Sequence, residues 1–151
     1  MPLRNGICVL RKAVPMVLIH GFVSPYVFLP PTKLLPNECY SEQKVQQLFH
    51  DVLSCGRWLK WVAVEVTSLA IMDGHHRQEV ALRLGLQVVP CVLLDYSNVR
   101  VESRRNDFVV NSVDIISRAR SGNLYPEKTT RHIFDNSIDL DCDIPISELR
   151  H

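Results

Sequence analysis

The sequence lacks the marks of several large classes of protein. No apolar run approaches the length of a transmembrane helix, no CxxC pair occurs, and the formal net charge is only +1. Membrane-spanning helices, structural zinc sites and a global positive field for nucleic acid are therefore not expected. A local basic patch stays open. No internal repeat, low-complexity stretch or helix-turn-helix pattern is visible.

The cysteines do not suggest a disulfide framework. They are odd in number, at positions Cys8, Cys39, Cys55, Cys91 and Cys142. We expect most of them to be small buried side chains in a reducing compartment. The apolar run 13–22 is interrupted by Pro15 and His20, and no small-residue cleavage site follows it. It is expected to form strand and loop rather than a signal peptide, so the predicted location is the cytoplasm.

What is present is an ordinary globular composition. The chain has 151 residues, of which 46% are hydrophobic and 22% charged. This predicts one domain over residues 1–151 with a real core. Its N-terminal strands are expected within residues 1–24 and a C-terminal binding segment within 123–151.

Three helices are predicted from apolar spacing and caps. The clearest follows Ser41, a plausible N-cap, and ends at Gly56; its apolar positions fall at i, i+3, i+4, i+7 and i+8, namely Val45, Leu48, Phe49, Val52 and Leu53. A second helix is expected over 76–84. A third is marked by the apolar residues Val109, Val113, Ile116 and Ala119.

Strands are predicted over 6–14, 17–20, 58–66, 69–72, 88–96 and 99–103. Residues 28–36 are expected to be extended, because the prolines there oppose a helix. The acidic and apolar stretch 138–149 is predicted to pack back on the body through three apolar side chains, Ile144, Ile146 and Leu149. Asp95 ends a buried strand and is expected to be a cap or turn residue rather than a metal ligand.

The stretch 71–77 carries the strongest chemical signal. A short buried strand ends in Asp73 and Gly74, and a helix begins directly afterwards. The first backbone N–H groups of a helix are unpaired, and the helix dipole adds positive charge there, so this turn is suited to an anion, usually phosphate. Gly74 permits close approach of a ligand, and His76 and Arg77 add side-chain donors. The plainer alternative is that Asp73 is only an N-cap.

A second cluster lies in the stretch 125–132. It gathers two cations, two hydroxyls and an imidazole within five consecutive residues, Lys128, Thr129, Thr130, Arg131 and His132. Such groups can clamp an anion, since lysine supplies a point charge, arginine a bidentate fork and threonine a neutral donor. A solvated surface loop is the alternative.

These pieces resemble the ParB/sulfiredoxin-like superfamily, and more closely its free serine kinases, which phosphorylate the hydroxyl of L-serine. Three motifs carry the resemblance: residues 35–38 (LPNE), residues 72–77 (MDGHHR) with their continuation to Tyr96, and residues 126–132 (PEKTTRH). They span most of the chain between Phe28 and His132. The implied fold is α/β (α+β), a small mixed sheet with packed helices.

The resemblance also implies roles for individual residues. Glu38 matches the glutamate that acts as catalytic base, and Asp73 matches an aspartate at the reacting centre. The turn that holds the nucleotide phosphates corresponds to Gly74, His75, His76 and Arg77. The segment that holds serine or its phosphorylated product corresponds to Lys128, Thr129, Thr130, Arg131 and His132. The implied cofactors are Mg²⁺ and a phosphoryl donor, ATP or ADP.

The chain departs from the pattern in two ways. It runs directly from the third helix to the 126–132 motif, where the archaeal kinases carry an extra segment. Arg104 stands at about the place of a tryptophan near the substrate. Both departures bear on the acceptor, so a related small hydroxyl compound stays open beside L-serine.

The same residues bear on other functions. Sulfiredoxin chemistry needs a cysteine in the phosphate turn, where this chain has His75. A ParB-like nucleotide-binding regulator or DNA-binding protein without kinase activity is the main alternative, although basic excess is lacking. Without the resemblance, Glu38 would be a solvated loop carboxylate. Adjacent histidines on a helix point to different faces, so His75 and His76 are not expected to bind one metal ion together.

The sequence thus predicts a kinase that makes O-phospho-L-serine, with Glu38 as general base and Mg²⁺ carried in with the nucleotide. The expected partners are the nucleotide and L-serine or a similar hydroxyl amino acid. Neither a membrane nor nucleic acid is expected as a partner. The oligomeric state stays open.

Overall fold

The computed structural model describes residues 16–19 and 22–151. Its helices are η1 (Pro31–Lys33), α2 (Glu42–Cys55), α3 (His75–Leu84), α4 (Ser112–Ser121) and η2 (Ile146–Leu149). Its strands are β1 (Met16–Ile19), β2 (Phe22–Leu29), β3 (Arg57–Lys60), β4 (Val62–Glu65), β5 (Ile71–Asp73), β6 (Val89–Leu94), β7 (Arg100–Ser103), β8 (Thr130–Ile133) and β9 (Asp141–Pro145). The strand expected over 6–14 lies outside the described residues.

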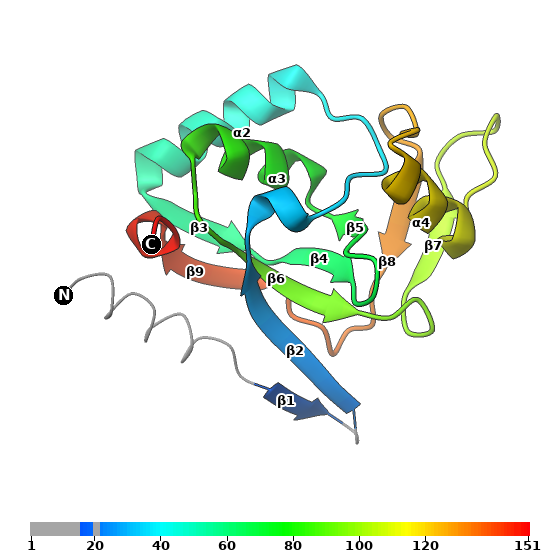
Figure 1. The fold of residues 1–151 in the computed structure, drawn as a ribbon, viewed down its shortest axis with the longest axis horizontal. Coiled ribbons are helices and arrows are strands. Elements are labelled where there is room, and N and C mark those ends of the chain that lie inside the picture. Colours follow the sequence, from blue (N-terminus) through cyan, green and yellow to red (C-terminus); the bar gives the residue numbers. More distant parts are fainter. Residues whose placement is uncertain (1–15, 20–21) are drawn as a thin grey trace.

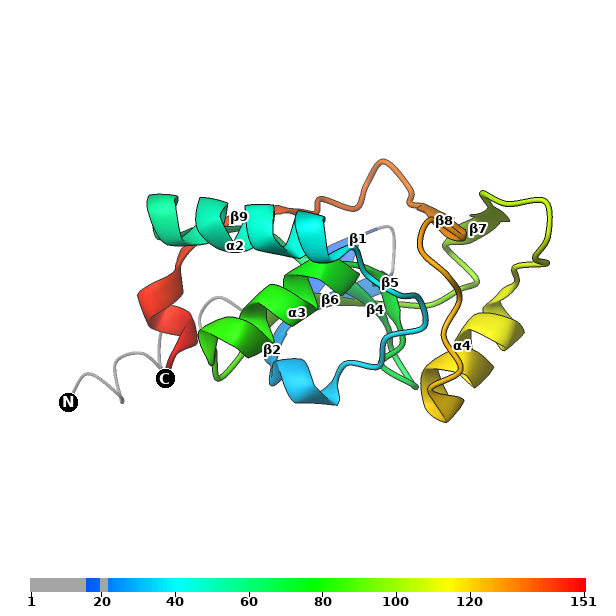
Figure 2. The same ribbon diagram turned by 90° about the horizontal axis from the view of Figure 1, so that it is seen from above.

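The main sheet has five strands in the order β1-β2-β6-β4-β5. Only β4 and β6 run parallel; the other neighbours are antiparallel. Two further pairs, β3 with β9 and β7 with β8, form small antiparallel sheets. Figures 1 and 2 show α2 and α3 side by side over the main sheet, with α4, β7 and β8 at one end and η2 at the other. The predicted α+β class with a mixed sheet is confirmed.

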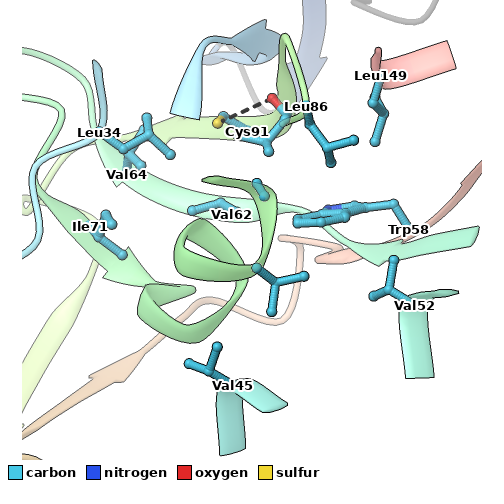
Figure 3. Close-up of a cluster of buried hydrophobic side chains, with 13 residues drawn as sticks. Leu34, Val45, Val52, Trp58, Val62, Val64, Ile71, Leu86, Cys91 and Leu149 are labelled. Atoms are coloured by element: carbon cyan, nitrogen blue, oxygen red, sulfur yellow. Dashed lines mark hydrogen bonds between the residues drawn. The ribbon is translucent and has the colours of Figure 1, made fainter. Parts of the chain in front are cut away.

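The larger core lies between the sheet and the two helices. Figure 3 shows Val62 and Val64 of β4 on one side of α3 and Val45 of α2 on the other, in one buried cluster with Val52 and Trp58. Leu149 is fully buried in this cluster, and Ile144 and Ile146 pack against it. The predicted return of the C-terminal stretch onto the body is therefore confirmed.

A second cluster covers the opposite face of the sheet. Successive strand residues point to opposite faces, so Ala63 lies here while its neighbours in β4 face the helices. The cluster is completed by Met72, Val92, Leu94 and Val99, and side chains such as Trp61 and Phe134 pack against it. Because β4 is covered on both faces, all four of its residues are buried.

The predicted helix ends are largely confirmed. Ser41 caps α2 by accepting a hydrogen bond from the Lys44 backbone N–H at 3.3 Å. Gly56, Gly85 and Gly122 end the three α-helices in left-handed conformations. Asn111, which lacked a role in the sequence analysis, caps α4 by accepting from the backbone N–H of Asp114.

Two predicted elements were wrong in detail. The strand expected over 58–66 is two strands, because the chain breaks at Trp61, whose N–H bonds to Leu140 outside the main sheet. The stretch 28–36 is not extended throughout, because Pro31 opens a short 3₁₀ helix. Proline is compatible with a first helical position, where its missing N–H would be unpaired anyway.

The third predicted helix is present as α4 and buries Ala119, one of the four residues that marked it, together with Ile115. Val113 is 74% exposed, however, and Val109 lies before the helix. The predicted burial of most cysteines was wrong. Among the described cysteines, Cys91 is buried and Cys142 half-buried, and burial raises the pKa of each thiol to about 12. The other two, Cys39 and Cys55, are exposed. In the part of the chain that the structure describes, no helix is long and apolar enough to cross a membrane.

Candidate functional site

Glu38 lies in a loop between η1 and α2 that meets the segment 126–132 from the far end of the sequence. A parallel bridge joins Glu38 to Tyr125: the Tyr125 N–H donates to the Asn37 carbonyl at 2.7 Å, and the Cys39 N–H donates to the Tyr125 carbonyl at 2.8 Å. We call residues 37–41 the Glu38 loop. Figures 1 and 2 show this loop beside the chain that leads into β8.

The Glu38 carboxylate accepts four hydrogen bonds from this segment. Its Oε1 accepts from the Thr129 N–H at 3.1 Å, the Thr130 N–H at 2.7 Å and the Thr130 hydroxyl at 2.9 Å. Its Oε2 accepts from the Lys128 N–H at 3.2 Å. Three successive N–H groups aimed at one anion form a backbone nest. The carboxylate is therefore held in a fixed orientation, in which Oε2 accepts one hydrogen bond and Oε1 accepts three.

The backbone of the nest has an unusual conformation. Lys128 has a φ of +58°, in the left-handed region that non-glycine residues rarely adopt. The Thr129 hydroxyl donates to the Pro126 carbonyl at 2.6 Å, and its residue is fully buried. These features turn the N–H groups of residues 128–130 in one direction.

The second predicted cluster lies where β5 ends and α3 begins. Arg77 Nη2 lies 3.3 Å from the Asp73 carboxylate, one turn apart, and the arginine side chain is only 14% exposed. Gly74 is buried with a φ of +125°. A Cβ there would lie 2.8 Å from Val62 Cγ1 and 3.2 Å from Arg77 Nη2. Glycine is thus required for packing on β4, in addition to any close approach of a ligand.

The two histidines of this turn face the Glu38 loop. His75 Nε2 accepts a hydrogen bond from the Asn37 backbone N–H at 3.2 Å. His76 Nε2 accepts from the Ser41 backbone N–H at 3.0 Å. The first-turn backbone N–H groups of α3 have no acceptor within the helix.

His132 joins the site from β8. Its Nε2 lies 2.8 Å from the Tyr96 hydroxyl, and its ring stacks on Phe134. Burial lowers the pKa of His132 to about 4, against an opposing effect of the Asp73 charge. The Glu38 loop links the two predicted clusters, because Asn37 bonds to His75 and Glu38 bonds to residues 128–130.

The remaining predicted residues are more peripheral. Lys128 and Arg131 are exposed, and Arg131 pairs with Glu102 in the β7–β8 ladder. The Arg104 backbone N–H donates to the Thr129 carbonyl at 2.8 Å, so the residue that replaces the expected tryptophan does lie beside the segment 126–132. Asp95 accepts from the Ser97 N–H at 2.8 Å, as expected of a turn residue.

No cluster of three metal-ligating side chains occurs among residues 16–19 and 22–151. Asp73 is the exposed carboxylate at the helix start, with its side chain 52% exposed. One carboxylate of this kind fits Mg²⁺ that arrives with a nucleotide, because Mg²⁺ keeps several waters and needs few protein ligands.

Asn37 and Tyr96 complete the site and were not predicted to do so. The Asn37 side chain donates to the Ile71 carbonyl at 2.7 Å and ties the Glu38 loop to β5. Tyr96 positions His132. The sequence offered a signal only for Asn37, since asparagine after proline favours a turn. The contacts themselves could not be predicted, because Ile71 and His132, the partners of Asn37 and Tyr96, are distant in sequence.

Comparison with known proteins gives one match at the sequence level. No family model matches the chain. A ParB-like protein from Sulfolobus acidocaldarius is 42% identical over 77 residues, which cover 51% of this chain and 38% of that protein. The chain therefore matches well under half the length of this curated relative.

Solved structures match far more of the chain. A free serine kinase in complex with AMP superposes with a TM-score of 0.74 at 16% identity, over 90% of this chain and 96% of that one. A conserved hypothetical protein from Pyrococcus furiosus gives a TM-score of 0.73 at 14% identity, over 90% and 100%. SbnI from Staphylococcus aureus, truncated at its C-terminus, gives 0.72 at 9% identity, over 81% and 88%. The chain has the ParB-like fold of the free serine kinases.

Proposed function

We propose that this protein is a cytoplasmic kinase that transfers a phosphoryl group from ATP or ADP to the hydroxyl of free L-serine, giving O-phospho-L-serine. The observation that carries the proposal is the Glu38 carboxylate, held by the nest of residues 128–130 beside a helix N-terminus suited to phosphate. Complexes of similarly folded kinases with AMP and ADP support a nucleotide as donor. The exposed thiols of Cys39 and Cys55 fit a reducing compartment.

The nucleotide phosphates would lie at the start of α3. The backbone of residues 74–77 supplies N–H donors there, with the positive end of the helix dipole. Arg77 adds a fixed cation, since Asp73 orients its guanidinium. Both features stabilise the charge that develops on the transferred phosphoryl group.

The acceptor would lie between this turn and the segment 126–132. Glu38 takes the proton of the serine hydroxyl, and its Oε2 is the suitable atom because Oε1 already accepts three hydrogen bonds. The hydroxyl oxygen then bonds to the terminal phosphorus while the bond to the bridging oxygen breaks, and the nucleotide leaves with one phosphate fewer. Lys128 and Arg131 are proposed to bind the serine carboxylate or the product phosphate.

Asp73 would hold Mg²⁺ together with the nucleotide phosphates. When bound, the ion neutralises phosphate charge and orients the donor. The protein's own part is to supply the carboxylate on the exposed side of the Asp73–Arg77 pair.

Two substitutions of Glu38 test the proposal. Glu38→Gln keeps one oxygen that can accept from Thr129 and Thr130 but cannot serve as base; we expect kcat to fall by about 100-fold or more, with the nucleotide Kd changed by less than about threefold. Glu38→Ala also removes the anchor of the nest, so the KM for serine should rise as well. Equal loss of turnover and nucleotide binding in Glu38→Gln would contradict the assignment of Glu38 as base.

A ParB-like nucleotide-binding regulator is the second candidate. The match to a ParB-like protein over 77 residues favours it. Nucleotide binding without serine-dependent turnover in the wild-type protein, together with DNA binding that changes with the nucleotide, would support this alternative.

A further inference from the structure

The two histidines at the start of α3 bracket Glu38. His75 accepts from the N–H of the residue before Glu38, and His76 accepts from the N–H three residues after it. Adjacent side chains of a helix project in directions about 100° apart. The Glu38 loop curves around the helix start, so both rings reach it.

Each contact requires the neutral imidazole with its proton on Nδ1. An imidazolium has two N–H donors and no acceptor, so protonation would remove both hydrogen bonds. The geometry itself requires this form, because each Nε2 faces a backbone N–H group, which can only donate.

His76 has a different electrostatic environment. Burial and the Lys44 charge lower its pKa, and Arg77 acts in the same direction. Glu127 and Glu38 oppose this shift. Lys44 lies on α2 and Arg77 on α3, whereas Glu127 precedes β8 and Glu38 lies in the loop that faces His76. The balance favours the neutral ring, which is the form the hydrogen bond to Ser41 needs.

The Glu38 loop has other anchors that do not depend on the histidines. Asn37 bonds to Ile71 and Tyr125, and Cys39 bonds to Tyr125. Ser41 continues directly into α2. Losing a histidine contact should therefore loosen the loop without unfolding the protein.

We propose that His75 and His76 are positioning residues, whose neutral rings fix the loop that carries Glu38 to the helix that receives the nucleotide phosphates. The base and the phosphate turn then form one rigid unit. This inference rests on the proposed kinase function for its catalytic consequence, whereas its structural part can be tested without any substrate.

The structural test measures the exchange of backbone amides by NMR. In the wild-type protein the Asn37 and Ser41 amides should be protected, and both imidazoles should show an unprotonated Nε2 at pH 7. In His75→Phe the Asn37 amide, and in His76→Phe the Ser41 amide, should exchange at least about tenfold faster. His50→Phe, a substitution on the exposed surface of α2, is the matched control and should leave both rates unchanged. Unprotected amides in the wild type, or a protonated Nε2, would overturn the inference.

The functional test separates positioning from phosphate binding. Loosening of the base should lower kcat on the order of 10- to 100-fold in both phenylalanine variants, with the nucleotide KM within about threefold of wild type. His76→Gln, whose amide oxygen can accept from Ser41, should recover part of kcat. A large rise in nucleotide KM with kcat intact would instead make these rings phosphate ligands and overturn the positioning role.

The two tests keep the inference separate from the proposed function. If the amides and tautomers behave as expected but no serine is phosphorylated, the kinase proposal fails and the role of the histidines in holding the loop stands. If turnover occurs but the phenylalanine variants match wild type in both exchange and kcat, the inference fails and the kinase proposal stands.

Discussion

Gly74 sits where backbone conformation and neighbouring side chains both exclude a β-carbon. Its φ of +125° strains any other residue, and the added carbon would press against Val62 and Arg77. Val62 is fully buried in β4, so its side chain has little room to shift. The position links the core to the proposed phosphate turn.

We therefore predict that Gly74→Ala lowers the free energy of unfolding by about 2 to 4 kcal/mol, the sum of backbone strain and overpacking. Urea unfolding followed by circular dichroism would measure it. Gly122→Ala is the control: its φ is +77°, but nothing lies within 4 Å of its Cβ position, so only about 1 kcal/mol should be lost. Equal losses in the two variants would refute the packing argument.

At this scale the sequence indicated the kinds of residue but not their contacts. Gly74 and Arg77 could be placed in one turn because they are close in sequence. The direction of His75 and His76 could not be predicted, because it depends on a loop that packs against them from nearly 40 residues earlier, as the Asn37–His75 bond shows. Likewise, the hydrogen bonds of Glu38 join residues some 90 positions apart.

Among the elements, α3 is tied to the segment before the Glu38 loop by one buried side chain. The Gln78 amide donates to the Pro31 carbonyl at 3.0 Å and to the Leu34 carbonyl at 2.8 Å. Gln78 is 7% exposed. The helix that begins at the phosphate turn thus also holds η1.

Replacing this donor should be costly. Gln78→Met keeps the length of the side chain but leaves a buried carbonyl without its donor, and we predict a loss of about 1 to 3 kcal/mol in the free energy of unfolding. Thermal and urea unfolding would measure it. Gln47→Met, at an exposed position on α2, should change stability by less than about 0.5 kcal/mol. An unchanged stability in Gln78→Met would show that the Leu34 carbonyl finds another donor, as the Pro31 carbonyl already has in the Leu34 N–H.

Local sequence signals predicted where helices begin and end better than they predicted which side of a helix is buried. The caps Ser41 and Gly56 are encoded by residues within a turn of the helix ends and were found where expected. The buried face of α4 was not predicted correctly, because Val113 and Ile116 are also spaced with a helical period, like the residues that are buried. Which face of α4 is covered is a property of the tertiary fold, which the spacing of apolar residues does not encode.

For the molecule as a whole, two neutral histidines link folding to pH. His75 and His132 have pKa values of about 3 and about 4 in the folded protein, below the ordinary value of 6.5. Between each folded-state pKa and 6.5, the histidine is protonated in the unfolded chain but not in the folded protein. Their contribution to stability is therefore full above pH 6.5 and is lost as the pH falls toward 4.

This predicts the slope of stability against pH. Near pH 5 each histidine should make the free energy of unfolding fall by about 1.4 kcal/mol per unit of decreasing pH. His132→Phe keeps an aromatic ring beside Phe134 and removes one titrating group, so its slope should be smaller by about that amount. Urea unfolding from pH 4.5 to 7 would measure both slopes, and identical slopes would show that His132 does not titrate below its ordinary range.

The chain as a whole combines a ParB-like fold with the Glu38 carboxylate, the turn proposed to hold phosphates and a cationic segment. The proposed phosphoryl transfer would use these three parts together, and either ATP or ADP would present its phosphates to the same turn.

Phosphorus NMR of the purified protein with Mg²⁺, L-serine and either ATP or ADP tests this central claim most directly. We predict a new phosphomonoester signal that requires serine and one of the two nucleotides, which would identify the donor in the same experiment. Nucleotide binding with no such signal, for serine and for a panel of other hydroxyl amino acids, would contradict the account.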